Sequence, residues 1–235
     1  MRRGCVATAL VIVLAAMASG CGDSNGDGSE TSTQAKKQAV PASLGTVESG
    51  AEDTIDLARG RDRAGVVTTS RELQEAAKGA AAADLRAAEV PADRITELQD
   101  RARLVAALAP RADLLRVSLA ANQVSALMPE FYARYTDPVP PEVLKLDYLD
   151  REAQLRSLAG DQRTVRAAVG VLSSTWAKLR AQVIDAGGEK VAESFTRHVR
   201  VMQRLARSSD RVALQKEAVA GLELVDQLED AFRKQ

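Results

Sequence analysis

The stretch PEVLKLDYLDREAQLRSLAGDQRTVRAAVGVLSSTWAKLRAQVIDA, residues 141–186, decides the fold that we expect for this chain. Between Leu144 and Val183 its larger apolar residues recur at alternating steps of four and three, which is the spacing of one packed helix face. Two polar residues, Arg151 and Gln162, interrupt this face. The stretch therefore predicts a long helix that buries one side against neighbouring helices.

The rest of the chain divides into segments of nearly the same length as this one. Together with it they form four segments of about 45 residues, at 46–89, 91–135, 141–186 and 189–233. Proline at a first helical turn and glycine at a helix end separate them. Short connections between helices of equal length make neighbours antiparallel. We therefore predict an all-α fold, an elongated antiparallel up-down-up-down bundle of four long, kinked helices.

Each segment also has a potential break near its middle. The breaks fall at Gly65, Pro110, Gly160–Asp161 and Ser208–Asp210. In a bundle of equal antiparallel helices these midpoints lie at one level, and proline or small polar residues let a helix bend there. We favour helices kinked at a common waist. The alternative is that each segment is two helices, which gives seven or eight shorter ones.

The composition is typical of helices and excludes several classes of partner and site. Aromatic residues make up only 3% of the chain, and the 32 basic residues balance the 32 acidic ones. A formal net charge of zero argues against a nucleic-acid partner, which requires a surplus of positive charge. The two cysteines, Cys5 and Cys21, both lie near the N-terminus. The remaining chain therefore cannot form a disulfide or a cysteine zinc site.

The N-terminus reads MRRGCVATALVIVLAAMASGCG, residues 1–22, with two arginines before a short apolar run and small residues before Cys21. It resembles the signal peptide and lipobox of bacterial lipoproteins, with Ala18 where that family most often has leucine. The resemblance implies that residues 1–20 are removed and that Cys21 carries lipid such as palmitate. It also implies a place in the bacterial cell envelope. That place is the outer membrane facing the periplasm in a Gram-negative cell, and otherwise the outer face of the cell membrane.

A polar linker follows the signal. Residues 21–43 are rich in glycine, serine, threonine and aspartate and offer little to bury. Such a composition predicts a disordered tether, and the lipobox resemblance implies that the lipid on Cys21 anchors it. The helical bundle domain is then expected to occupy residues 44–235.

The polar residues on the predicted packed faces are candidates for a site. Reflecting positions across the second turn brings Arg151 close to Asn122, and the first and fourth segments offer Asp53, Asp56 and Glu223 at the same level. A buried arginine is costly unless a carboxylate pairs with it. We therefore predict a polar cluster of these residues. A role in fixing the helix register is favoured over the alternative role of binding a ligand.

His198 is the only histidine of the chain, and it lies opposite Trp176 across the third turn. We expect these two side chains to pack together. The chain has no G-x-S-x-G elbow for a Ser-His-Asp arrangement and no Glu-x-x-His motif for a metal bundle. No cofactor and no metal are therefore expected.

These observations favour a non-enzymatic binding or scaffolding module in the cell envelope. Its expected partners are the membrane, through the lipid on Cys21, and an unknown envelope protein, polymer or small ligand. The alternative is an enzyme or a metal- or cofactor-binding bundle that uses acidic residues together with Tyr148 or His198.

Overall fold

Helices account for most of residues 38–208 and 210–234, which are the residues described by this computed structural model. The predicted signal peptide, the lipidation site Cys21 and most of the predicted tether lie outside them. The first helix, α1, begins at Ala42 with Pro41 as its N-cap. The helical region therefore starts slightly before the predicted domain boundary at residue 44.

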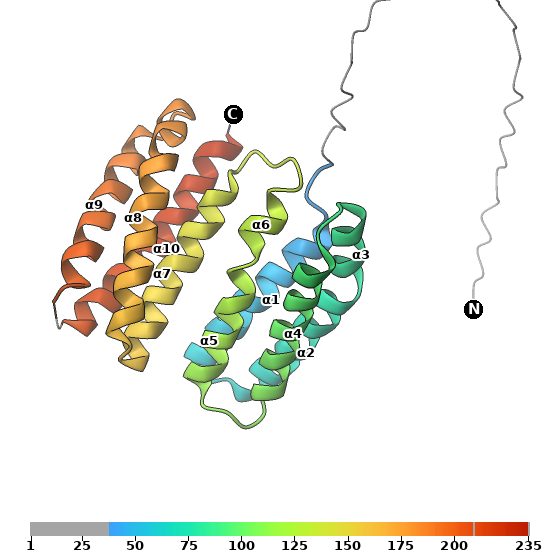
Figure 1. Cartoon of the computed structure of the whole chain (residues 1–235). Helices are drawn as coiled ribbons and strands as arrows, with labels where there is room; N and C mark the ends of the chain where they lie inside the picture. Colours follow the sequence, from blue (N-terminus) through green and yellow to red (C-terminus); the bar gives the residue numbers. More distant parts are fainter. Residues whose placement is uncertain (1–37, 209, 235) are drawn as a thin grey trace, which may run out of the picture. The chain divides into compact units, whose positions relative to one another are not determined.

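The first half of the described chain is a bundle in which α1 packs against α2 and α5, and α4 closes the ring (Figure 1). Short helices continue α2 and α5. Leu44, Leu73, Leu98 and Phe131 are almost completely buried in one core. The helices are α1 (Ala42–Arg59), α2 (Arg63–Lys78), α3 (Ala80–Ala87), α4 (Ala92–Leu108), α5 (Leu114–Ser125) and α6 (Met128–Tyr132).

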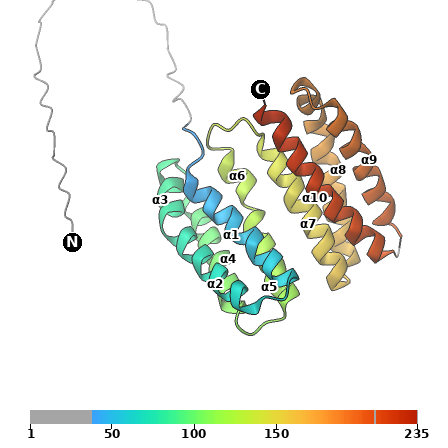
Figure 2. The same cartoon turned by 180° about the vertical axis from the view of Figure 1, so that it is seen from behind.

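The second half is another four-helix bundle with its own core. Its helices are α7 (Pro141–Ala159), α8 (Gln162–Asp185), α9 (Glu189–Leu205) and α10 (Arg211–Arg233). Each helix packs against the next one in the chain, and α10 packs against α7 to close the ring (Figures 1 and 2). Leu146, Leu172, Phe195 and Leu228 are buried at its centre. Both cores are built from residues between 44 and 232.

The all-α, antiparallel prediction is confirmed, but the four helices of 45 residues are wrong. The longest helix in the described residues is α8, with 24 residues. Gly160–Asp161, Pro110 and Ser208–Asp210 lie in connections where the chain reverses direction, and Gly65 lies inside α2, just after such a reversal. Each predicted long helix is therefore divided by a reversal of the chain into two or three helices. The alternative of shorter helices was closer, although the described residues form ten helices and not seven or eight.

The two bundles repeat the same arrangement along the chain. The connection between α1 and α2 ends at Asp62, and the one between α7 and α8 ends at Asp161, 99 positions later. At the same separation, Arg61 and Gly160 both adopt a left-handed conformation, with φ of 60° and 77°. In α4 and α9 the buried residues also match each other, with a separation of 97 positions in the chain. The two halves are thus internal structural repeats.

The bundles meet through α5 and α6 of the first and α7 of the second. This contact changes the face of α7 that is buried. The sequence pattern selected Leu144, Arg151 and Leu158, but the core of the second bundle instead takes Val143 and Leu146. Leu158 is 50% exposed. The predicted face of α7 is turned toward the first bundle, where it forms the floor of a cleft.

Candidate functional site

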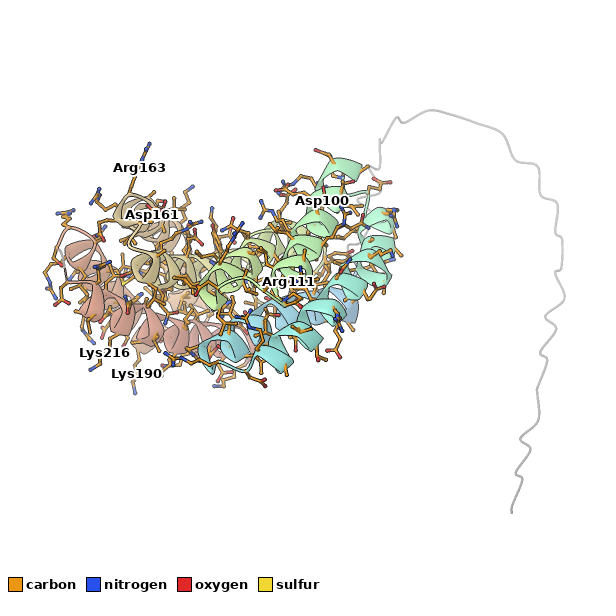
Figure 3. All side chains as sticks on the ribbon, turned by 90° about the horizontal axis from the view of Figure 1, so that it is seen from below. Asp100, Arg111, Asp161, Arg163, Lys190 and Lys216 are labelled. Carbon is orange, nitrogen blue, oxygen red and sulfur yellow. The ribbon has the colours of Figure 1, made fainter. Side chains whose placement is uncertain are left out.

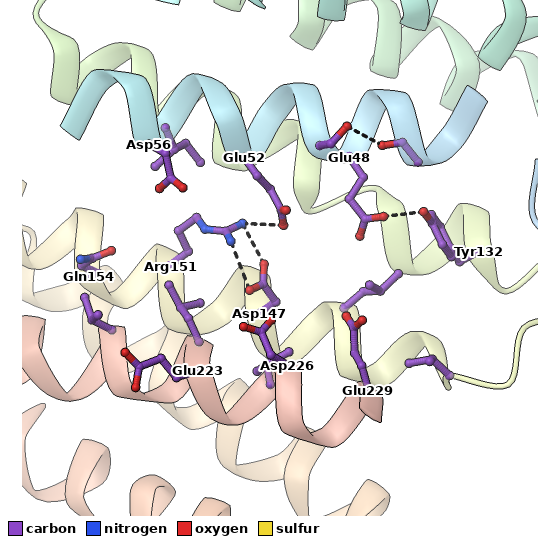
Figure 4. A pocket seen from close by; sticks show the side chains of 18 of the residues that line it. Glu48, Glu52, Asp56, Tyr132, Asp147, Arg151, Gln154, Glu223, Asp226 and Glu229 are labelled. Carbon is purple, nitrogen blue, oxygen red and sulfur yellow. Dashed lines mark hydrogen bonds and ion pairs between the residues drawn. The ribbon is translucent and has the colours of Figure 1, made fainter. Parts of the chain in front are cut away.

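A cleft of about 690 Å³ opens between the two bundles. Helices α1 and α10 form its walls, and α7 lies at its base with Tyr132 of α6 at one end (Figure 4). Three arginines line it, Arg59, Arg151 and Arg233, against a larger set of acids. These acids are Glu48, Glu52, Asp56, Asp137, Asp147, Glu223, Asp226 and Glu229.

Arg151 lies at the centre of the cleft, and its side chain is only 11% exposed. One guanidinium nitrogen lies 3.1 Å from Glu52 Oε1 of α1 and 2.8 Å from Asp147 Oδ2 of α7. Burial lowers the pKa of Arg151, but the attraction of these two carboxylates outweighs burial and raises it. Arg151 is therefore a fixed positive charge that joins the two bundles across the cleft.

Three carboxyl groups of the cleft, Asp147, Glu48 and Glu229, have raised pKa values. Burial raises the pKa of Asp147 above its ordinary value despite its ion pair with Arg151, and the neighbouring Glu52 adds to the effect. Burial also raises the pKa of Glu48 to about 7, although a hydrogen bond donated by the Tyr132 hydroxyl opposes the shift. On the opposite wall, burial raises the pKa of Glu229. The cleft thus holds more carboxyl groups than its three arginines can pair with.

The predicted polar cluster is only partly assembled. Asp56 and Glu223 line the same cleft as Arg151, but they are not its ion-pair partners. Asp53 is exposed and lies on another face of α1. The partner on α1 is Glu52, so the register of the prediction was wrong by one residue.

Asn122 belongs to a separate buried contact between the bundles. Its side-chain amide donates to Glu152 Oε2 at 2.9 Å, and Glu152 in turn accepts from Arg156 Nε at 2.7 Å. Asn122 also approaches the backbone carbonyl of Tyr148, at 3.4 Å. Burial raises the pKa of Tyr148, which lies half-buried on α7. This contact ties α5 to α7 and does not line the cleft.

His198 forms a buried polar group inside the second bundle. Its Nε2 lies 3.0 Å from Asp150 Oδ1, and its Nδ1 lies 2.9 Å from Glu217 Oε1. Burial lowers the pKa of His198, but the two carboxylates outweigh burial and raise it. Because His198 is only 2% exposed and Asp150 is fully buried, no substrate can reach them in this conformation. The group serves packing between α7, α9 and α10.

The predicted pair of Trp176 and His198 is separated by Phe195. The Phe195 ring centroid lies 4.7 Å from that of Trp176 and 5.2 Å from that of His198. The indole nitrogen of Trp176 donates instead to Thr196 Oγ1 at 3.0 Å. The three rings form one cluster with tilted and edge-to-face contacts on the buried side of the α8–α9 pair.

Within residues 38–208 and 210–234, no three His, Cys, Asp or Glu side chains are arranged to hold a metal ion. In the same part of the chain, no helix combines the length and the apolar character needed to cross a membrane.

Sequence reasoning missed Glu48, Glu52, Asp226 and Glu229 as members of the cleft. A usable signal was present on α1, because Glu48, Glu52 and Asp56 are spaced by four and share one helix face. The acids of α10 show a similar stripe at steps of three. Nothing in the sequence indicated that α7 packs between the two bundles. This packing brings the acids of α1 and the acids of α10 to the same cleft.

Comparisons with known proteins identify no relative of this chain. No protein-family model, no curated protein and no solved structure matches this chain.

Proposed function

We propose that this protein is a lipid-anchored, non-enzymatic binding module of the bacterial cell envelope whose cleft binds a ligand with two or more positive charges. The cleft carries the proposal, because eight carboxylates and three arginines line a cavity large enough for a small organic ligand. A ligand with spaced amino groups matches this charge. Polyamines and short basic peptide segments belong to this class.

The walls of the cleft are suited to a cation because their eight carboxyl groups outnumber the three arginines that line it. Glu48 and Glu229 face each other from opposite bundles, and burial raises the pKa of both. A bound amine would stabilise their ionised forms. Affinity should therefore rise as the pH increases from about 5.5 to 8, through the folded-state pKa of Glu48 near 7.

Calorimetric titration of the full chain with spermidine tests the cleft. A variant with Asp226→Asn and Glu229→Gln should bind at least about tenfold more weakly, because two carboxylates of one wall are lost. The matched control, Asp93→Asn with Asp100→Asn, removes the same charge from the exposed face of α4. Equal losses in the two variants, or no binding at low salt, would refute the proposal.

The membrane anchor rests on the lipobox resemblance and needs its own test. Cys21→Ser removes the sulfur that the lipid requires. We expect this variant to be released from membranes or to remain unprocessed. A Cys21→Ser protein that is processed and anchored like the wild type would rule out lipidation at Cys21.

A further inference from the structure

The neutral net charge of the chain hides a strong local imbalance. Residues 162–207, which form the α8–α9 hairpin, contain nine arginines and lysines but only three acids. The equivalent hairpin of the first bundle, residues 63–110, contains seven basic and seven acidic residues. One of two structurally equivalent hairpins is therefore strongly basic, and the other is balanced.

The difference arises at equivalent exposed positions. Four acids of the first hairpin are replaced by neutral or basic residues in the second. In order, Glu72, Glu75, Asp93 and Asp100 correspond to Val171, Ser174, Lys190 and Arg197.

Ion pairing differs in the same way. In the first hairpin Arg94 and Arg101 both pair with Glu97, and Arg103 pairs with Asp100. Among the described residues, no carboxylate lies within 4.0 Å of any of the nine cations of the α8–α9 hairpin. These cations therefore form no ion pair within the described part of the chain and are available to a partner.

Several of these cations lie on an exposed face of α9 and the adjoining part of α8. Arg197, Arg200 and Arg204 follow one another at steps of three and four on the solvent side of α9. Arg180 of α8 lies across a shallow depression from Arg197 and Arg200. Figure 3 shows that Arg163 of α8 also points outward into solvent.

This face lies on the side of the second bundle away from the cleft. Helices α7 and α10 line the cleft, whereas α8 and α9 pack on their other side (Figure 1). A negatively charged surface would attract the arginines of α9 and repel the acids of α1 and α10. The charge distribution therefore favours one orientation on such a surface, with the cleft facing away from it.

We propose that the exposed α8–α9 face binds the anionic headgroup surface of a phospholipid membrane. Each lysine or arginine close to such a surface contributes about 1 kcal/mol, so a few of these side chains give measurable attraction. The aromatic residues of the hairpin, Trp176 and Phe195, are buried and offer no exposed ring on which a nucleic-acid base could stack. The proposal does not rest on ligand binding in the cleft or on the lipid at Cys21.

Co-sedimentation with vesicles tests this proposal. The protein used starts at Gly22, which removes the signal and the lipidated cysteine but keeps both cores, and circular dichroism and thermal melts verify its fold. Vesicles of phosphatidylcholine with about 30% phosphatidylglycerol are compared with pure phosphatidylcholine at about 50 and 500 mM salt. We expect binding only to the anionic vesicles and only at low salt.

Three variants identify the face. Arg197→Gln, Arg200→Gln and Arg204→Gln together should weaken binding at least about tenfold. The control with Arg71→Gln, Arg86→Gln and Arg103→Gln makes the same charge change on exposed positions of the first hairpin and should bind nearly as well as the wild type. The variant with Arg197, Arg200 and Arg204 all changed to lysine should still bind anionic vesicles, because lysine keeps the positive charge.

Several results would overturn the proposal. They are equal losses in the two glutamine triples, loss of binding in the lysine triple, equal binding to neutral vesicles, and no binding to anionic vesicles at low salt. Tighter binding to a duplex DNA fragment than to anionic vesicles at the same salt would also contradict it.

Discussion

Gly221 lets α10 approach the buried Asp150–His198 pair. A Cβ atom at position 221 would lie 2.5 Å from Asp150 Oδ2 and 2.6 Å from His198 Nε2. Gly221→Ala must therefore push apart a buried ion pair, and we expect a loss of about 2–4 kcal/mol in unfolding free energy. Urea denaturation measures this change.

Gly170 in α8 provides the matched control. It also lies inside a helix, but an added Cβ there would contact nothing within 4 Å. Gly170→Ala should stabilise the protein by about 0.5–1 kcal/mol, because alanine loses less backbone entropy than glycine. If Gly221→Ala behaved like Gly170→Ala, α10 would not be packed against the pair.

The same pair gives folding a defined pH dependence. The pKa of His198 is raised above its ordinary value of 6.5, because the attraction of Asp150 and Glu217 exceeds the cost of burial. The stability contributed by a raised histidine pKa is complete below about pH 6.5 and is lost as the pH rises through the folded-state value. Burial also raises the pKa of Asp150, which acts in the same direction.

We therefore expect the melting temperature to fall as the pH rises from about 6.5 to 9, and to fall less in His198→Gln. The variant still carries the other titrating groups, so the difference between the two pH profiles isolates the histidine. Parallel profiles would mean that His198 carries no charge in the folded protein.

At the scale of helices, one residue in the reversal between α1 and α2 has a left-handed backbone conformation. The equivalent reversal of the second bundle has glycine at this position, which adopts the conformation without strain. Arg61 adopts a left-handed φ of 60°, where the equivalent residue between α7 and α8 is Gly160. Glycine has no Cβ to strain in this conformation. Arg61→Gly should raise the unfolding free energy by about 1 kcal/mol, as measured by chemical denaturation.

Gly160→Ala is the reciprocal change and should destabilise by a similar amount, because it places a side chain at a φ of 77°. Destabilisation by Arg61→Gly would show that the guanidinium makes a contact that outweighs the backbone strain.

The sequence predicted the helical class and the connections near residues 90, 136–140 and 187, because proline and glycine mark them. The kinks predicted at the midpoints of the four segments were wrong, because the same residue types occur at a helix kink and at a reversal of the chain. An aspartate N-cap distinguishes them, since its side chain accepts a backbone N–H only where a new helix begins. Every midpoint has one, with an apolar residue buried four positions later. The caps are Asp62, Asp113, Asp161 and Asp210.

At the scale of the whole molecule, Arg151 connects the two bundles. The sequence predicted that a carboxylate pairs with the buried Arg151. In the structure Arg151 neutralises both Glu52 and Asp147, and further acids lie nearby. Removing its charge leaves these carboxylates unpaired, so we expect Arg151→Met to destabilise the protein by about 3 kcal/mol at pH 8.

Protonation of Asp147 should relieve this loss at lower pH, because the pKa of this buried carboxyl is already raised. Adding Asp147→Asn to Arg151→Met should likewise recover part of the stability. Thermal melts of the single and double variants at two pH values provide the check. A neutral Arg151→Met at pH 8 would show that the cleft does not need its central charge.

The members of the site could be predicted only in part from the sequence, for a physical reason. Arg151 stood out because it interrupts an apolar face, but α7 contacts helices of both bundles and has more than one apolar face. A single periodicity therefore could not decide which face enters the core. Glu48 and Glu229 come from helices that are far apart in the chain and meet only when the bundles pack together.

The most direct test of the acidic cleft is a carbon-13 NMR titration of the Glu48 carboxyl group, with and without saturating spermidine. The free protein should titrate with a pKa of about 7. A bound cation favours the ionised carboxylate, so spermidine should lower this pKa by about one unit or more. An identical titration curve with and without spermidine would contradict binding of a cation in the cleft.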